Sequence, residues 1–127
     1  MHQDAHHDAL IKDFVAEFND IFEHSDQAVY VYLDDTNKAC NGKFATLLGY
    51  ASAEEWAAVS TPFPPTFVGD KSQHDLVTAY QAAMEKKIAS TVPIYWKKKS
   101  GETVATSVIL VPVVFQGHLL ALHFVTV

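Results

Sequence analysis

Apolar and acidic side chains recur at helical spacing near the start of the chain. Residues 9–23 place large apolar side chains three and four positions apart, with acidic side chains between them. This periodicity predicts an amphipathic helix, and we assign residues 1–25 to an N-terminal helical segment. Its apolar stripe exceeds what one sheet edge needs, which favours a homodimer through Ile11, Phe14, Val15, Phe18, Ile21 and Phe22. The alternative is a lid over the sheet of the same chain.

The next segment has the alternation of a strand. Residues 27–33 place apolar and aromatic side chains on alternate faces, and many of them are β-branched or aromatic. The Asp-Asp-Thr-Asn sequence at residues 34–37 carries side chains that hydrogen-bond their own backbone in tight turns. We therefore predict a hairpin whose short second strand is residues 38–40.

Two short helices are predicted after this hairpin. Asn41 is placed to cap the first helix and Gly49 to end it in the left-handed conformation, and its apolar side chains share one face: Phe44, Leu47 and Leu48. The Ser-Ala-Glu-Glu sequence at residues 52–55 predicts a capping box for the second helix, which carries Trp56.

A cluster of three prolines separates these helices from a longer one. Pro62, Pro64 and Pro65 each remove a backbone donor, so we expect an irregular loop, packed onto the core by its apolar side chains. Residues 72–89 then carry an apolar stripe, with Ser72 as the expected N-cap and lysines in the last turn. This pattern predicts the long helix.

Three strands are predicted to complete the chain, at residues 91–98, 102–115 and 118–127. Ser100-Gly101 and Gln116-Gly117 between them are two-residue hairpin signals. Pro112 cannot donate to a ladder, so we expect a bulge or an unpaired position there. With the first two strands, these predict an α+β fold with five antiparallel strands.

Composition and charge narrow the classes of function. A net charge of −6 with a pI of about 5.5 repels phosphate backbones and disfavours nucleic-acid binding. No apolar run reaches the roughly 20 residues that cross a bilayer, and the N-terminus lacks a signal-peptide pattern. We therefore expect no membrane association and a cytoplasmic location. Cys40 is the only cysteine, and we interpret it as a small buried apolar residue.

The ordered motifs carry a family resemblance. The pattern Asn-x-x-Phe-x-x-Leu-x-Gly-Tyr at residues 41–50, then Ser-x-Glu-Glu, and later Lys99-Ser100-Gly101 between two strands, resembles the PAS domain. That family is a sensory and dimerisation module of signalling proteins. The resemblance implies a PAS fold over residues 26–127, with helices inserted between strands 2 and 3. The resemblance also implies a homodimer and a signalling-protein partner. We expect the chain to be either a free-standing module or a region excised from a larger sensor.

A PAS domain can keep a cavity between its helices and its sheet. The side chains expected to line one, and to stack on a small apolar or aromatic ligand, are Phe44, Leu48, Trp56, Phe67, Tyr80, Ile94, Trp96, Val108, Leu110, Leu122 and Phe124. The alternative is that these side chains simply fill the core.

His74 suggests a different kind of sensor. The Gln73-His74-Asp75 sequence near the start of the long helix resembles the haem-ligating position of oxygen-sensing PAS domains. The arginine that those sensors use on the following strands is absent here, since all nine basic residues are lysines. We therefore expect no cofactor and keep haem as an alternative. His2 and His6 have metal-compatible helical spacing, but a solvated, frayed terminus at residues 1–8 is the preferred interpretation.

No catalytic pattern stands out. The sequence has neither a Gly-x-Ser-x-Gly elbow nor a glycine-rich phosphate loop, so we do not expect an enzyme. A small α+β enzyme with a buried acid remains a weaker alternative, for which Asp26 or Asp70 would have to face a wet cavity.

Overall fold

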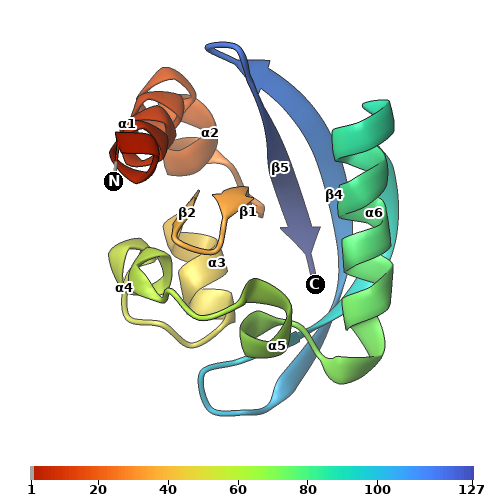
Figure 1. The fold of residues 1–127 in the computed structure, drawn as a ribbon. Helices are drawn as coiled ribbons and strands as arrows, with labels where there is room; N and C mark the ends of the chain where they lie inside the picture. Colours follow the sequence, from red (N-terminus) through yellow and green to blue (C-terminus); the bar gives the residue numbers. More distant parts are fainter. Residues whose placement is uncertain (1) are drawn as a thin grey trace.

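The computed structural model describes the backbone of residues 2–127 and the side chains from His7 onward. Its centre is an antiparallel sheet with the strand order β2-β1-β5-β4-β3 (Figure 1). The strands are β1 (Ala28–Asp34), β2 (Asn37–Cys40), β3 (Ser90–Lys97), β4 (Thr103–Phe115) and β5 (His118–Thr126). The predicted five-stranded α+β architecture is confirmed, with strand ends displaced by one residue in places.

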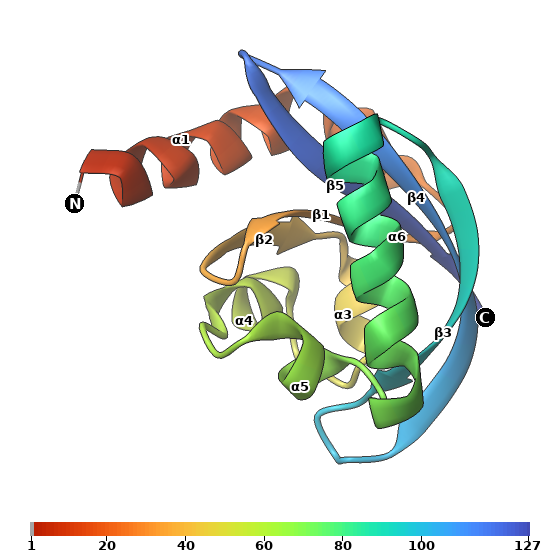
Figure 2. The same ribbon diagram turned by 45° about the vertical axis from the view of Figure 1, so that its right-hand side comes forward.

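Helices cover both faces of this sheet. The inner face carries the elements between β2 and β3, namely α3 (Gly42–Leu47), α4 (Ala53–Ala58), α5 (Phe63–Phe67), the 3-10 turn η1 (Asp70–Ser72) and α6 (Gln73–Lys86). The outer face carries α1 (His2–Glu17) and α2 (Asn19–His24). Figure 2 shows α1 and α6 on opposite sides of the sheet. The core therefore has two separate apolar layers.

The N-terminal helix differs from the prediction at its start and in its middle. It begins at His2, so the backbone of residues 2–8 is helical where a frayed terminus was expected. It also breaks at Phe18, whose φ of −103° and ψ of 31° separate α1 from α2. The break lets Phe14 on α1 and Phe22 on α2 meet edge to face, with ring centroids 6.4 Å apart, above the same strands. The side chains of His2 and His6 lie outside the described residues.

The apolar stripe of this segment packs on its own chain. Leu10, Ile11, Phe14 and Phe22 are buried against the outer face of β1 and β5. Val15, Phe18 and Ile21 are only half-buried at the margin of the same layer. The segment thus covers its own sheet, which is the lid arrangement considered above, and it leaves three of the six candidate dimer residues partly exposed.

The capping predictions hold around α3 and α4. The Asn41 side chain accepts a hydrogen bond from the Phe44 backbone N–H at 3.0 Å, and Ser52 accepts one from Glu55 at 3.0 Å. The Glu55 carboxylate accepts a hydrogen bond from the N–H of Ala51 rather than from that of the cap residue, Ser52. Asn41 also bonds the backbone of β1, so the cap fastens the helix to the sheet.

The proline cluster was predicted as irregular, and this is wrong. Residues 63–67 form α5 with Pro64 and Pro65 in its first turn, where the missing N–H groups would have no helical partner anyway. The expectation that this segment packs onto the core is confirmed, because Phe63, Phe67 and Val68 are all buried.

Two further details of the second half correct the sequence analysis. Ser72 does not cap α6 with its side chain, and its hydroxyl instead accepts a hydrogen bond from the Tyr95 N–H at 2.9 Å. Pro112 causes no register shift and pairs with Ala121 in an unbroken β4–β5 ladder. Because β3 reaches only as far as Leu110 on the other side of β4, no strand there needs a donor from Pro112.

Candidate ligand pocket

A small cavity lies between α5, α6 and the inner face of β1 and β5. Its volume is about 250 Å³, and its walls are mostly aromatic and aliphatic. The residues that line it are Tyr30, Tyr32, Phe63, Pro64, Leu76, Val77, Tyr80, Gln81 and His123. The strand alternation brings Tyr30, Tyr32 and His123 to this face, and the apolar stripe of α6 supplies the opposite wall.

Tyr30 is the central residue of the pocket wall. Its ring packs against Phe44, Phe63 and Trp96 with centroids 4.8, 5.6 and 5.5 Å away. Its side chain is 1% exposed, and its hydroxyl has no hydrogen-bond partner among the described residues. Burial raises the pKa of this phenol well above its ordinary value. A buried hydroxyl without a partner is costly, so it marks a place where a partner would bind favourably.

His123 lies directly beside Tyr30 on the neighbouring strand. The two rings stack with centroids 3.9 Å apart and planes 10° apart. Burial lowers the pKa of His123 to about 3, against the opposing effect of the backbone carbonyls of Ala121 and Tyr30. The imidazole is therefore neutral near pH 7. Its Nδ1 lies 3.2 Å from the Ala121 carbonyl oxygen, which can only accept, so Nδ1 carries the proton and Nε2 is an acceptor.

One edge of the pocket is fixed by Asp35 in the β1–β2 turn. The Tyr32 hydroxyl donates to the Asp35 carboxylate at 3.0 Å, and the Phe63 backbone N–H donates to the same oxygen at 2.9 Å. The Tyr32 and Tyr80 rings meet edge to face, 5.4 Å apart. Burial and the Asp35 hydrogen bond raise the pKa of Tyr32, so it stays a neutral donor. These contacts hold the start of α5 against the hairpin.

Most of the predicted lining residues fill the core instead. Of the candidates, Tyr80 lines the pocket, while the others on this side of the sheet are buried in the surrounding apolar layer: Phe44, Leu48, Trp56, Phe67, Ile94, Trp96, Val108 and Leu110. Leu122 and Phe124 lie on the outer face, against the N-terminal helices. The predicted pocket face of β5 is therefore wrong, and His123 lines the pocket where Leu122 and Phe124 were expected.

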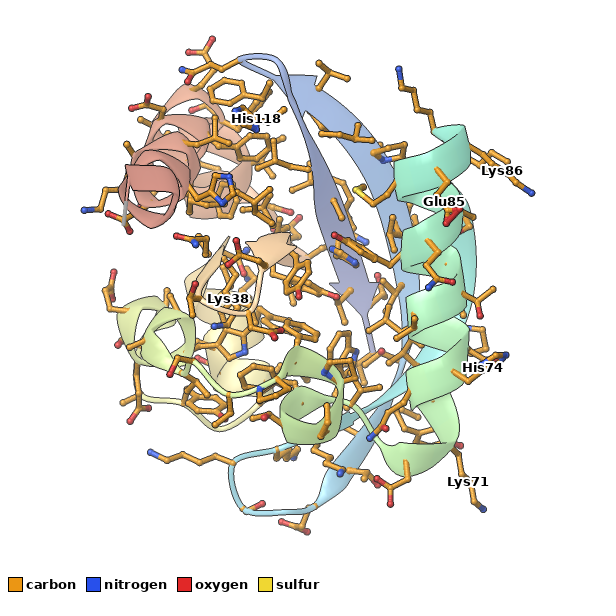
Figure 3. The ribbon with its side chains drawn as sticks, in the orientation of Figure 1. Lys38, Lys71, His74, Glu85, Lys86 and His118 are labelled. Carbon is orange, nitrogen blue, oxygen red and sulfur yellow. The ribbon has the colours of Figure 1, made fainter. Side chains whose placement is uncertain are left out.

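His74 lies away from this pocket. It is exposed on α6, and Figure 3 shows its side chain pointing away from the sheet. Asp26 and Asp70 are also exposed, and Asp70 pairs with Lys97 at 2.9 Å. Neither carboxylate has the buried position that acid catalysis would need. No group of three or more metal-ligating side chains occurs among the described residues.

A buried lysine beneath α4 was not anticipated from the sequence. Lys38 is 3% exposed, and its ammonium donates to the backbone carbonyls of Asp35, Ala57 and Val59. Burial lowers its pKa. The ammonium thereby donates to carbonyls at the C-terminal end of α4, and it has no donor left for a ligand in the pocket. Cys40 is buried as predicted, and burial raises the pKa of its thiol to about 12.

A larger but more open groove runs between α2 and the α3–α4 pair. Its volume is about 870 Å³, and Phe22, Cys40 and Leu47 are among the residues that line it. None of the buried polar atoms that lack a hydrogen-bond partner in the described part of the chain belongs to its walls. The smaller pocket is therefore the better candidate for a specific ligand.

Comparison with known proteins identifies the family. The family model described as "PAS domain" matches residues 16–81, which is just over half of the chain. The chain therefore belongs to the PAS domain family, whose members are sensory signal-transduction modules. No curated protein sequence matches it.

Solved structures share this fold at low sequence identity. A PAS domain from Colwellia psychrerythraea is 20% identical, with a TM-score of 0.67 over 89% of this chain and 95% of that one. The PAS domain of the fruit-fly ELK potassium channel is 14% identical, with a TM-score of 0.64 over 89% and 95%. A domain of a sensor histidine kinase/response regulator from Geobacter sulfurreducens is 12% identical, with a TM-score of 0.63 over 92% and 96%. No helix in the described part of this chain is long and apolar enough to span a bilayer.

Proposed function

We propose that this protein is a sensory module in which a small apolar or aromatic molecule binds between α6 and the sheet and alters the docking of α1 and α2. One observation supports this proposal above the others: the pocket and the N-terminal helices share strands β1 and β5, on opposite faces of the sheet. Tyr30 and His123 form a cross-strand pair of β1 and β5 on the pocket side. A change in their positions displaces the backbone on which the helices rest.

The outer face of the same strands makes the connection direct. Val31 and Leu122 pair across β1 and β5 one residue beyond Tyr30 and His123, and both are buried under the N-terminal helices. Phe14 is fully buried in this layer. Because a close-packed core accommodates a displaced strand only by moving its neighbours, a shift on the pocket side reaches α1 and α2.

The proposal includes a homodimer or a signalling partner at the margin of these helices. Val15, Phe18 and Ile21 keep part of their apolar surface exposed beside an acidic surface. A ligand that changes how α1 and α2 dock would change this surface. Haem ligation by His74 is not part of the proposal, because that side chain is exposed and lies outside the pocket.

Hydrogen–deuterium exchange tests the coupling. The protein is measured alone and with toluene, p-cresol or indole at concentrations that saturate any binding detected by thermal shift. We expect exchange in α1 and α2 to change together with exchange in α6. The turn between β3 and β4 at residues 98–102, where Lys99 bonds Leu48 and Glu55, should stay unchanged. A bound compound that alters α6 but leaves α1 and α2 as they were would refute the coupling.

Sedimentation equilibrium tests the dimer. Val15→Asp places a charge on the partly exposed margin, whereas the matched change Ala16→Asp places it on an exposed position of the same helix. We expect a dimeric wild type, a dimeric Ala16→Asp variant and a monomeric Val15→Asp variant with an unchanged circular dichroism spectrum. A monomeric wild type at high micromolar concentration would overturn this part of the proposal.

A further inference from the structure

The pocket also indicates which chemical class of ligand it would accept, an inference that rests on the proposed function. We infer that it binds an uncharged planar molecule of one or two rings whose polar group hydrogen-bonds the Tyr30 hydroxyl. Three independent features of the described residues carry this inference: the volume of the pocket, its charge, and the polar atom left without a partner.

The volume of the pocket favours a small ligand. Pockets for drug-sized ligands have volumes of about 300–1,000 Å³, and this one holds about 250 Å³. Its aromatic walls, which include Tyr30, Phe63 and Tyr80, suit a flat ring. A tetrapyrrole or a three-ring flavin exceeds this space, so the haem alternative fails here on size as well as on the position of His74.

The charges around the pocket exclude an anionic ligand. None of the lining residues is a lysine or arginine, and the lining histidine, His123, is neutral because burial lowers its pKa to about 3. The buried Lys38 ammonium is held by three backbone carbonyls and is not part of the pocket wall. The formal charges near the pocket include the carboxylates of Asp34 and Asp35, and Asp35 accepts hydrogen bonds from Tyr32 and Phe63. A carboxylate or phosphate would therefore lose its hydration without gaining a cation.

The polar atom identifies the ligand's functional group. Tyr30 lines the pocket, and its hydroxyl is buried without a hydrogen-bond partner among the described residues. Its raised pKa keeps the proton in place, so it is available to donate to a ligand oxygen. His123 beside it offers Nε2 as an acceptor. A phenolic hydroxyl suits this pair, because it can accept from the tyrosine and donate its own proton.

An NMR titration of the full chain with three ring compounds of similar size tests the charge and the hydrogen bond separately. The compounds are p-cresol, which is a neutral phenol, toluene, which lacks the hydroxyl, and benzoate, which is charged. We expect p-cresol to bind most tightly, with shift changes confined to residues around the pocket. In Tyr30→Phe the affinity for p-cresol falls about 3- to 10-fold, the range for one hydrogen bond, while that for toluene is unchanged. The exposed Tyr95, changed to Phe, is the matched control and leaves every affinity as it was.

The outcomes distinguish this inference from the function on which it rests. If benzoate binds as tightly as p-cresol, or if Tyr30→Phe leaves the preference for p-cresol intact, the ligand class is wrong and the sensory proposal stands. If none of the three compounds binds at millimolar concentration, the ligand class and the proposed small-molecule function are both overturned. Tyr30→Phe is expected to fold, since it removes a hydroxyl that the folded protein leaves without a partner.

Discussion

Acid destabilisation through His123 is the sharpest consequence of the pocket geometry. The folded protein keeps this imidazole neutral, with its pKa lowered by burial from 6.5 to about 3. The unfolded chain takes up a proton on it below pH 6.5. Because the unfolded state then binds more protons, the free energy of unfolding falls as the pH falls from about 6.5 toward 3. At about 1.4 kcal/mol per pH unit, the loss attributable to this residue at pH 5 is about 2 kcal/mol.

Urea unfolding at several pH values measures this loss. Trp56 and Trp96 are both fully buried, so their fluorescence reports the transition. His123→Phe keeps a ring against Tyr30 but cannot bind a proton, and we expect it to remove about 2 kcal/mol of the difference between pH 7 and pH 5. The exposed His74, changed to Gln, is the control and should retain the wild-type slope. The reasoning is refuted if His123→Phe and wild type lose stability equally.

Three substitutions test the fold itself, each by urea unfolding at pH 7. Phe14→Ala should lower the free energy of unfolding by about 3–5 kcal/mol, because it empties the centre of the outer apolar layer; a loss below 1 kcal/mol would mean that the helices dock loosely. Asn41→Ala should lower the free energy of unfolding by about 2–4 kcal/mol, since it removes both the cap of α3 and the partner of the Val29 N–H. A loss no larger than that expected from removing the helix cap alone would contradict this. Gly69→Ala should cost about 1–3 kcal/mol, because its Cβ would lie 3.0 Å from the Tyr95 carbonyl oxygen; unchanged stability would show that the strand yields.

The sequence predicted those parts of the fold that depend on local chemistry. Asn41 and Ser52 cap their helices, Gly49 takes a φ of 83°, and Gln116-Gly117 forms the tight turn between β4 and β5. Each of these signals acts within a few residues, so no tertiary contact is needed to interpret it. The same local reasoning failed at the prolines, because a proline in the first turn of a helix is compatible with a helix.

The pocket was harder to predict, because it depends on which face of β5 points inward. Apolar residues occupy both faces of that strand, so alternation gives no preference: Leu122 packs outward and Ala121 packs inward, and both are buried. The signal that could have helped was His123, a titratable residue within an otherwise apolar run. The Tyr30 hydroxyl could not have been identified from sequence, since its lack of a partner is a property of the packed core.

The location of the pocket under β1 and β5, rather than elsewhere on the sheet, gives the arrangement its capacity to signal. The outer face of β3 and the adjoining part of β4 is uncovered, with Tyr95 52% and Ile109 43% exposed. On that face, a displacement of the sheet would move side chains against solvent. Beneath β1 and β5, the same displacement meets the close-packed layer that includes Phe14. A ligand against Tyr30 and His123 therefore acts on the part of the sheet that carries the N-terminal helices.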